Sequence, residues 1–393
     1  MNDWQTCAVP DSFVKSKVGR QNQIPAKDIA EVGRFPVVDQ GQKFVAGYCD
    51  DESRVIDFDL PLIIFGDHTR CLKYVDFPFV LGADGTKVLR PNKKLYDPIF
   101  YYFALLSLEI PSRGYNRHFT ILNERSLPLP PLPEQKKIAH ILSTVQRAIE
   151  AQERIIQTTT ELKKALMHKL FTEGLRGEPQ KHTEIGPVPE SWEVVALGSL
   201  AKVGNGSTPK RANDAFWEGG TIPWLNSSKI HDRFIIEADQ FVTPQAVKEC
   251  HLPSVAPNSL LIAITGQGKT LGNSAITRIE TCINQHLAYV QFHMAKIVPD
   301  FMLWFMQTRY DYLRSIAHGG GSTKGALSCG FLKTLPVPIP SPAEQKEIVA
   351  AFQILEDKQV FAVRKQAALQ DLSRTLLHEL MSAKRRVNSL SLP

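Results

Sequence analysis

The sequence lacks the cysteine and histidine patterns that mark zinc sites and disulfide frameworks. Its six cysteines form no C-x-x-C pair, and no histidine cluster completes a zinc spacing, so we predict reduced thiols and no bound metal. Long apolar runs are absent too. No segment reaches membrane-spanning length, and the start, MNDWQTCAVPDSF, lacks the basic-then-apolar order of a signal peptide. These absences predict a cytoplasmic protein without a membrane partner.

Catalytic motifs are equally scarce. The sequence contains no Asn/Asp-Pro-Pro-aromatic tetrad of the methyltransferase kind, no G-x-S-x-G elbow and no G-x-G-x-x-G in a strand–helix context. Residues 263–270, AITGQGKT, fit a relaxed nucleotide-binding P-loop, but such a loop must open a helix whose N-terminus holds phosphates. The following LGNSAITRIE is a poor helix because it contains glycine, asparagine and β-branched residues. We therefore expect no catalytic residue and no cofactor in this chain, and keep a P-loop nucleotide-binding enzyme as an alternative.

The charge imbalance is small. Lysine and arginine number 46 against 40 aspartates and glutamates, a net charge of +6, which permits a nucleic-acid partner without demanding one. The length of 393 residues indicates two or three domains.

An internal repeat organises the chain. Residues 128–136 read PLPPLPEQK and residues 338–346 read PIPSPAEQK, so that Glu134-Gln135-Lys136 recurs as Glu344-Gln345-Lys346. The same register, without a gap, continues to Leu170 in the first copy and Leu380 in the second. A match held over nearly forty residues indicates a duplicated structural unit.

Both copies have the apolar periodicity of a long helix. The predicted seam contains Ile138, Leu142, Val145, Ile149, Ile156, Leu162, Leu166 and Leu170 in the first copy, and Ile348, Phe352, Leu355, Ala362, Leu369, Leu372, Leu376 and Leu380 in the second. Gln152, Thr159, Gln359 and Gln366 interrupt it. Because an apolar seam of this length is unfavourable when exposed to water, we expect the two helices to pack on each other in antiparallel orientation. Each helix would be ~57 Å long at a rise of ~1.5 Å per residue. The recurring His168 and His378 are expected to serve packing or docking.

Each helix follows a globular segment of mixed character. Apolar runs at 35–38, 62–65, 77–81, 260–264 and 287–292 predict strands, and 98–108 and 299–316 predict helices. We predict an α+β protein in which two mixed α/β domains are separated by two long helices that form an antiparallel coiled coil, with a pseudo-two-fold internal repeat. The predicted parts are domain one (1–133), central helical region (134–176), linker (177–190), domain two (191–340), C-terminal helical region (341–385) and tail (386–393).

These features resemble the specificity subunits of type I restriction–modification enzymes. The similar stretches include RFPVVDQGQKFVAGYCDD at 34–51, PLIIFGDHTRCLKYVDFPFVLGADGTKVLRP at 61–91, PESWEVVALGSL at 189–200, GNGSTPKRANDAFWEGGTIPWLNSSKI at 204–230 and LLIAITGQGKTLGNSAI at 260–276, besides the two Pro-rich EQK segments. The resemblance covers nearly the whole chain after about residue 20. Residues 1–20 show no clear counterpart to PESWEVVALG.

The resemblance implies a non-catalytic subunit that binds double-stranded DNA. Each globular domain would read one half of a split target, and the helices would fix the gap between the halves and dock two methyltransferase subunits and the restriction/translocase subunits. It implies that S-adenosylmethionine, ATP and magnesium belong to those partners. We assign partner docking to Glu134, Gln135, Lys136, Glu344, Gln345 and Lys346.

Polar clusters between the predicted strands are the candidate DNA-reading residues. Arginine and lysine read guanine, asparagine and glutamine read adenine, and lysine and serine mostly hold phosphate. The candidates are Gln40, Lys43, His68, Thr69, Arg70, Arg113, Asn116 and Arg117 in domain one, and Lys210, Arg211, Asn226, Ser228, Lys229, Lys269 and Lys324 in domain two. Solvated loops are the alternative for each residue, loop-bonding roles are the alternative for Asp67 and Asn284-Gln285, and a coiled-coil scaffold without a DNA role is the alternative for the whole chain.

Overall fold

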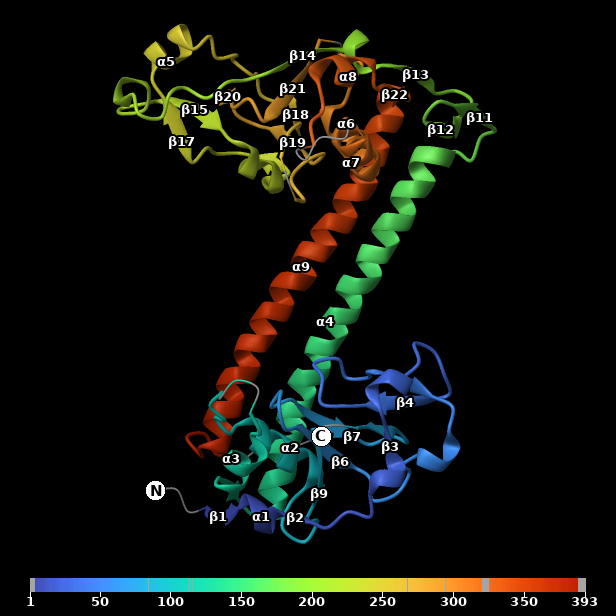
Figure 1. Cartoon of the computed structure of the whole chain (residues 1–393), viewed down its shortest axis with the longest axis vertical. Helices are drawn as coiled ribbons and strands as arrows, with labels where there is room; N and C mark the ends of the chain where they lie inside the picture. Colours follow the sequence, from blue (N-terminus) through green and yellow to red (C-terminus); the bar gives the residue numbers. More distant parts are fainter. Residues whose placement is uncertain are drawn as a thin grey trace. The chain divides into compact units, whose positions relative to one another are not determined.

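The computed structural model describes residues 4–83, 85–112, 114, 116–266, 268–293, 295–319 and 325–387. The chain divides into two compact units (Figure 1). The first unit comprises residues 1–155 and 362–393, and the second unit comprises residues 156–361. Each contains a mixed α/β domain and one part of each of two long helices, α4 (Leu132–Glu173) and α9 (Pro342–Met381).

The domain of the first unit is built mainly from short strands. In chain order its elements are β1 (Gln5–Ala8), α1 (Val9–Ser12), β2 (Phe13–Val14), β3 (Gln23–Ile24), β4 (Phe35–Val38), β5 (Gly47–Cys49), β6 (Leu62–Gly66), β7 (Leu72–Val75), β8 (Val80–Gly82), β9 (Thr86–Pro91), α2 (Pro98–Leu106), α3 (Phe119–Asn123) and β10 (Ser126–Leu129). They form sheets of order β2-β9-β6-β7 and β3-β8-β4-β5 and a two-stranded ribbon, β1-β10.

The domain of the second unit has more elements. They are β11 (Gln180–Thr183), β12 (Gly186–Pro189), β13 (Glu193–Ala196), β14 (Ala201–Asn205), β15 (Ile222–Leu225), the 3₁₀ helix η6 (Ser227–Asp232), β16 (Phe234–Ile235), β17 (Gln240–Val242), α5 (Pro244–Glu249), β18 (Leu260–Ala263), β19 (Ser274–Thr277), β20 (Cys282–Ile283), β21 (Leu287–Phe292), α6 (Pro299–Thr308), α7 (Tyr310–His318), α8 (Cys329–Thr334) and β22 (Pro336–Ile339). The main sheet has the order β14-β21-β18-β19-β16, and a smaller sheet has the order β17-β15-β20.

The two domains share one topology although their sequences differ. The sheet β2-β9-β6-β7 corresponds strand for strand to β14-β21-β18-β19, and the parallel pair β4-β8 corresponds to the parallel pair β15-β20. The ribbon β1-β10 corresponds to β13-β22, and a tryptophan, Trp4 or Trp192, immediately precedes the first strand of each ribbon. The start of the chain therefore does have a counterpart to PESWEVVALG, which the sequence did not reveal because only the tryptophan and one alanine, Ala8 or Ala196, are shared.

Most predicted elements lie where the apolar runs placed them. The strand predicted at 77–81 is displaced to β8, because Pro78 cannot donate a ladder hydrogen bond and the preceding segment is joined only by a bridge between Phe79 and Ile56. The helix predicted at 299–316 is divided into α6 and α7 at Arg309. Proline opens both α2 and α6, where a missing amide proton costs nothing.

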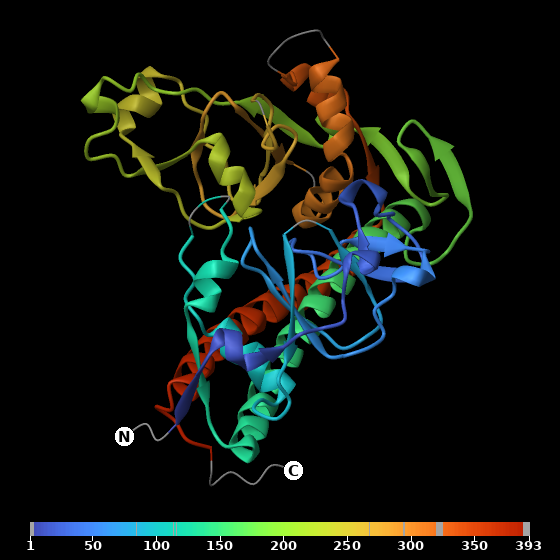
Figure 2. The ribbon, with the colours of Figure 1, turned by 60° about the horizontal axis from the view of Figure 1, so that its bottom comes forward.

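The two long helices pack antiparallel within each unit (Figures 1 and 2). In the first unit Gln366 Nε2 donates to Glu153 Oε1 at 3.0 Å, and Leu380 packs in one core with Ile138 and Leu142. In the second unit Gln359 Nε2 donates to Thr160 Oγ1 at 2.9 Å, and Leu170 packs in one core with Ile348 and Phe352.

The seam of α4 is more polar than we predicted. Leu162 is 52% exposed and, at the equivalent position of α9, Leu372 is 45% exposed, so neither belongs to the seam. Gln152 and Thr159, predicted to interrupt it, are buried. Taken together, the buried and half-buried positions of α4 keep alternating steps of three and four residues, the coiled-coil spacing, and they include polar side chains.

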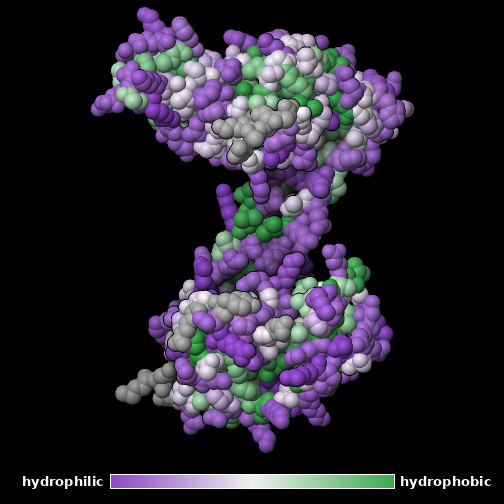
Figure 3. Space-filling model, viewed as in Figure 1, coloured by the Kyte–Doolittle hydropathy of each residue, from purple (hydrophilic) through white to green (hydrophobic). Residues whose placement is uncertain are grey.

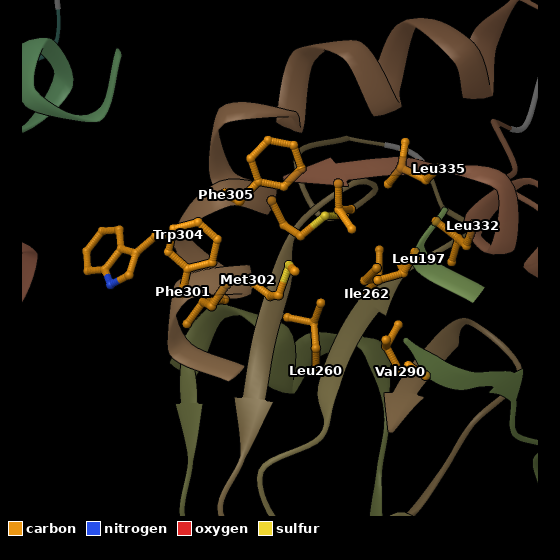
Figure 4. Packing of buried hydrophobic residues seen from close by; sticks show 14 of the residues in the cluster. Leu197, Leu260, Ile262, Val290, Phe301, Met302, Trp304, Phe305, Leu332 and Leu335 are labelled. Atoms are coloured by element: carbon orange, nitrogen blue, oxygen red, sulfur yellow. The ribbon is translucent and has the colours of Figure 1, made fainter. Parts of the chain in front are cut away.

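Aromatic side chains fill the core of the second unit. Phe301 and Phe305 of α6 belong to this core, in which Met302 points toward Leu260 and Ile262 of β18, whereas Trp304 points away from them (Figure 4). The Trp304 ring also stacks on Phe352 of α9, with 4.6 Å between ring centroids. This single core joins the domain to both helices. The surface that Figure 3 shows is mostly hydrophilic. No described helix combines the length and apolar character that a membrane span needs.

Candidate nucleic-acid interface

Loops from separate parts of the chain meet at one sheet edge in the first unit. The parallel strands β4 and β8 both end there, and β6 ends there opposite the start of β9, with Gly66 paired to Thr86. The described residues of the loops after these strands, 39–46, 66–71, 83 and 85, therefore lie together. The backbone amide of His118 donates to Asp67 O at 2.8 Å, which brings residues 116–118 to the same edge. We call these four segments loop cluster one.

Side chains of loop cluster one hold the loops against each other. Gln40 Oε1 accepts from the His68 amide at 3.1 Å, and Thr69 Oγ1 donates to Gln40 O. Lys73 Nζ donates to Lys43 O at 2.5 Å. Three of the predicted residues, Gln40, His68 and Thr69, are thus neighbours in space, and the fourth, Lys43, contacts Lys73 of β7.

Asp67 has the structural role that we considered as its alternative. Its side chain is 3% exposed, and Oδ1 accepts from the Phe119 amide at 2.7 Å. Of the arginines, Arg70 donates to Ile110 O at 2.9 Å, and Arg70, Arg117 and the adjacent Asn116 are all exposed. Arg113 lies outside the described residues.

The second unit has an equivalent edge. The parallel strands β15 and β20 end there, and β18 ends opposite the start of β21, with Ala263 paired to Leu287. Residues 226–233, 264–266, 268–273 and 284–286 follow these strands, and 206–213 follows β14, whose Asn205 pairs with Ala288. The Leu327 amide donates to Ile264 O at 2.7 Å, so Leu327 lies at this edge as His118 does in the first unit. We call these segments loop cluster two.

Hydrogen bonds connect the members of loop cluster two. Thr208 Oγ1 donates to Gln285 Oε1, which joins loops 77 residues apart. His231 Nε2 lies 3.1 Å from Thr270 Oγ1. Gly206 permits the first of these contacts, because a Cβ there would collide with the carbonyl of Ile283.

Of the predicted residues of domain two, some are exposed lysines and others are held by contacts within the domain. Lys210 and Lys269 are exposed, while Asn226 caps η6 by accepting from the Ser228 amide at 2.9 Å. Arg211 stacks on the ring of Trp217, 3.8 Å from its centroid, and donates to Gln240 Oε1 at 2.6 Å. Lys324 lies outside the described residues.

Lys229 is engaged within its own loop. Its ammonium group lies 2.9 Å from Asp232 Oδ2 and 3.2 Å from Asp239 Oδ1. Hydrogen bonds to Asp232 and then Asp239 raise the pKa of Lys229. A lysine that already faces two carboxylates offers less charge to a phosphate than Lys210 or Lys269 does.

Sequence reasoning missed Gln285, His286 and Thr265 as possible contact residues. Gln285 and His286 lie in the loop after β20, and the His286 ring contacts Thr265 across the edge. The available signal was a polar Asn-Gln-His triplet directly after a buried strand. We interpreted Asn284-Gln285 as loop-bonding, which holds for both: Asn284 Oδ1 accepts from the His286 amide at 3.0 Å, and Gln285 Oε1 accepts from Thr208 Oγ1.

The segment resembling a P-loop lies within this edge but does not have the P-loop structure. β18 before it pairs antiparallel with β19 after it, with Leu261 opposite Ala275. A strand therefore stands where a P-loop requires a helix N-terminus. This removes the structural basis for the nucleotide-binding alternative.

The repeated Glu-Gln pairs are structural rather than exposed. Gln135 and Gln345 have no exposed surface. Gln345 Oε1 accepts from the Val298 amide at 2.8 Å, and Nε2 donates to Lys296 O at 3.0 Å and Pro340 O at 2.9 Å. Gln135 repeats the pattern with the amide of Asp97 and the carbonyls of Leu95 and Pro130. Each glutamine ties the start of a long helix to the start of α2 or α6.

The glutamates bind the tryptophans before the ribbons. Glu134 Oε2 accepts from Trp4 Nε1 at 3.1 Å, and Glu344 Oε2 accepts from Trp192 Nε1 at 3.2 Å. Both glutamates are 3% exposed. Burial corrects the docking assignment of Glu134, Gln135, Glu344 and Gln345, since a side chain with almost no exposed surface cannot touch a partner. Lys136 and Lys346 are exposed.

The described residues contain no group of three or more histidine, cysteine, aspartate or glutamate side chains that could hold a metal ion. His168 and His378 lie on α4 and α9, and His378 Nε2 lies 2.8 Å from Lys384 Nζ.

Comparison with known proteins gives a consistent result. A family model described as the type I restriction modification DNA specificity domain matches residues 1–160 and 189–369. The putative type I restriction enzyme MjaX specificity subunit of Methanocaldococcus jannaschii is 27% identical over 79% of this chain and 73% of its own length. The EcoR124I/EcoR124II specificity subunit of Escherichia coli is 26% identical over 83% of this chain and 80% of its own length.

Solved structures show the same fold. The type I restriction–modification S subunit from M. genitalium aligns over 96% of both chains with a TM-score of 0.64 at 18% identity. A chain from a structure on complex assembly and conformational transition of the type I R-M system aligns over 96% of this chain and 97% of its own, with a TM-score of 0.54 at 16% identity. With its family match across both halves and its duplicated fold, this chain belongs to the type I restriction–modification DNA specificity family.

Proposed function

We propose that this specificity subunit reads a split DNA target, one half with loop cluster one and the other half with loop cluster two. The observation that carries the proposal is the duplicated edge: in each unit, loops separated in sequence meet at equivalent strand ends and differ in their side chains. The same framework can therefore present two unlike sets of base-reading groups. Lys43, Arg117, Lys210 and Lys269 are exposed at these edges and would neutralise phosphates, while Gln40, Asn116 and Gln285 carry the amides suited to adenine.

The helices are proposed to serve the assembly. In this proposal α4 and α9 set the separation of the half-sites and dock two methyltransferase subunits, with Lys136 and Lys346 as exposed contact residues, and the complex also contains restriction/translocase subunits. Family members are DNA-recognition subunits without a catalytic centre. S-adenosylmethionine, ATP and magnesium would accordingly be bound by the partners, in the cytoplasm.

We assign the proposed roles to the parts of the chain by the boundaries predicted from sequence. Residues 1–133 and 191–340 would be the two target-recognition domains. Residues 134–176 and 341–385 would be the helical regions, with a linker at 177–190 and a tail at 386–393.

Deletion of the gene tests the proposed function. We expect modified-base mapping of the genome to show methylated adenines at one split motif in wild-type cells and none at that motif after deletion. Restoring the gene should restore the modification at the same positions. An unchanged methylation pattern after deletion would contradict the proposal.

A coiled-coil scaffold without a DNA role predicts a different result. The complex assembled with its methyltransferase subunits should shift a DNA duplex in a gel, and binding should weaken steeply with salt because phosphate contacts release counterions. A scaffold would give no salt-dependent shift above that of the methyltransferase subunits alone.

A further inference from the structure

A cluster of charged side chains joins the recognition domain of the second unit to both long helices. Arg233 follows η6, Lys163 lies on α4 and Glu356 lies on α9. Lys163 Nζ lies 2.6 Å from Glu356 Oε1, and Arg233 forms an ion pair with the same oxygen. The Glu356 carboxylate on α9 thus pairs with the Lys163 ammonium on α4 and with the Arg233 guanidinium of the recognition domain.

The cluster is built against the hydrophobic core. The Lys163 ammonium lies 4.7 Å and the Arg233 guanidinium 4.5 Å from the centroid of the Trp304 ring. The side chains of Lys163, Glu356 and Arg233 are 16%, 17% and 26% exposed. Partly buried ion pairs are less screened than surface pairs, and cation–π contacts strengthen on desolvation.

The electrostatics of the cluster agree with this geometry. Burial alone would raise the pKa of Glu356, but hydrogen bonds from Arg233 and Lys163 outweigh it and lower the pKa. Burial is also the main cause that lowers the pKa of Lys163. Removal of the carboxylate would leave two partly desolvated cations facing each other.

Arg233 belongs to the same short segment as three candidate DNA contacts. Asn226, Ser228 and Lys229 lie four to seven residues before it, on or beside η6. His231, in between, contacts Thr270 of the neighbouring loop. The ion pair with Glu356 therefore connects a segment of loop cluster two directly to α9.

The first unit lacks charge at the equivalent helix positions. The repeat places Gln146 at the position of Glu356 and Ser373 at the position of Lys163. Gln146 Nε2 donates to Glu150 Oε1 on its own helix at 3.1 Å. The charged cluster is therefore a feature of the second unit and not a general requirement of the repeated helices.

We propose that Arg233, Glu356 and Lys163 are positioning residues that clamp the second recognition domain to the helices and so restrict the number of base pairs between the two half-sites. The proposal rests on the proposed function of the loop clusters. Without the clamp, the domain can tilt on the aromatic core, and targets with a spacer one base pair too long or too short become acceptable.

The test compares spacer lengths in the complex assembled with its methyltransferase subunits. Duplexes carry the split motif with the natural spacer, or with one base pair added or removed, and the methylation rate is measured on each. The quantity compared is the methylation rate on the natural spacer divided by the rate on an altered spacer. For Glu356→Gln and for Arg233→Gln we expect this ratio to fall about tenfold. Gln146→Ala, the matched control at the repeat-equivalent position, should keep the wild-type ratio within about twofold.

The outcomes separate the two proposals. Ratios unchanged in both clamp variants, in complexes that assemble normally, would overturn the clamp and leave the proposed function standing. Equal losses of rate on all spacers would also overturn it, because a merely structural role has no spacer preference. Absence of methylation by the wild-type complex on every split duplex would overturn the proposed function and the clamp with it. If Glu356→Gln fails to assemble, Arg233→Gln decides, since it leaves both helices unaltered.

Discussion

Replacement of Gln345 by leucine is expected to lower the free energy of unfolding of the second unit by about 4 kcal/mol, because three buried backbone groups lose their partner at about 1–3 kcal/mol each. These groups are the amide of Val298 and the carbonyls of Lys296 and Pro340. Leucine matches the volume but supplies neither donor nor acceptor. Urea unfolding followed by tryptophan fluorescence measures the change, since four of the five tryptophans lie in this unit: Trp192, Trp217, Trp224 and Trp304.

The neighbouring lysine is the control for this prediction. Lys346 is exposed, so Lys346→Leu should change stability by less than about 0.5 kcal/mol. Gln135→Leu should destabilise the first unit through the same three kinds of bond. A loss below about 1 kcal/mol for Gln345→Leu would show that the buried amide does not hold the start of α9.

Simultaneous alanine substitution of Lys43, Arg117 and Lys269 is expected to weaken DNA binding of the assembled complex about a hundredfold at moderate salt. The three side chains are exposed at the loop clusters. Alanine preserves the backbone carbonyls of Lys43 and Lys269, which accept from Lys73 and Tyr310, so the loops should keep their structure. Fluorescence anisotropy across a salt series should show a log–log slope shallower by about 2–3, near 0.9 for each phosphate that the variant no longer neutralises.

A second triple variant distinguishes loop position from net charge. Lys15, Lys202 and Lys333 are exposed outside the loop clusters, and their replacement by alanine removes the same charge. We expect the affinity to change by less than about threefold and the salt slope by less than about 1. Equal weakening in both variants would assign DNA binding to general positive charge and count against the loop clusters.

The two long helices could be predicted from sequence because helix formation here depends on a local, periodic pattern of apolar residues. Apolar residues at steps of three and four specify a helix face wherever they occur, and a register shared by two segments indicates a shared structure. The strands β4 and β21 have the predicted bounds for a related reason, since each is a short apolar run. The roles of Leu162 and Thr159 escaped this reasoning, because hydropathy alone does not tell which of several neighbouring residues faces the partner helix.

The amino-acid sequence by itself determined the family, the duplication, the long helices and the residue types available to meet DNA. Only the tertiary structure decided which of those residues meet, because the neighbours of Gln40 or Gln285 depend on strands pairing across tens of residues. The tertiary structure also placed Gln135 and Gln345 inside the protein. A polar side chain is buried only where other groups satisfy its hydrogen bonds, here backbone groups from distant segments, and the local sequence does not show which segments these are.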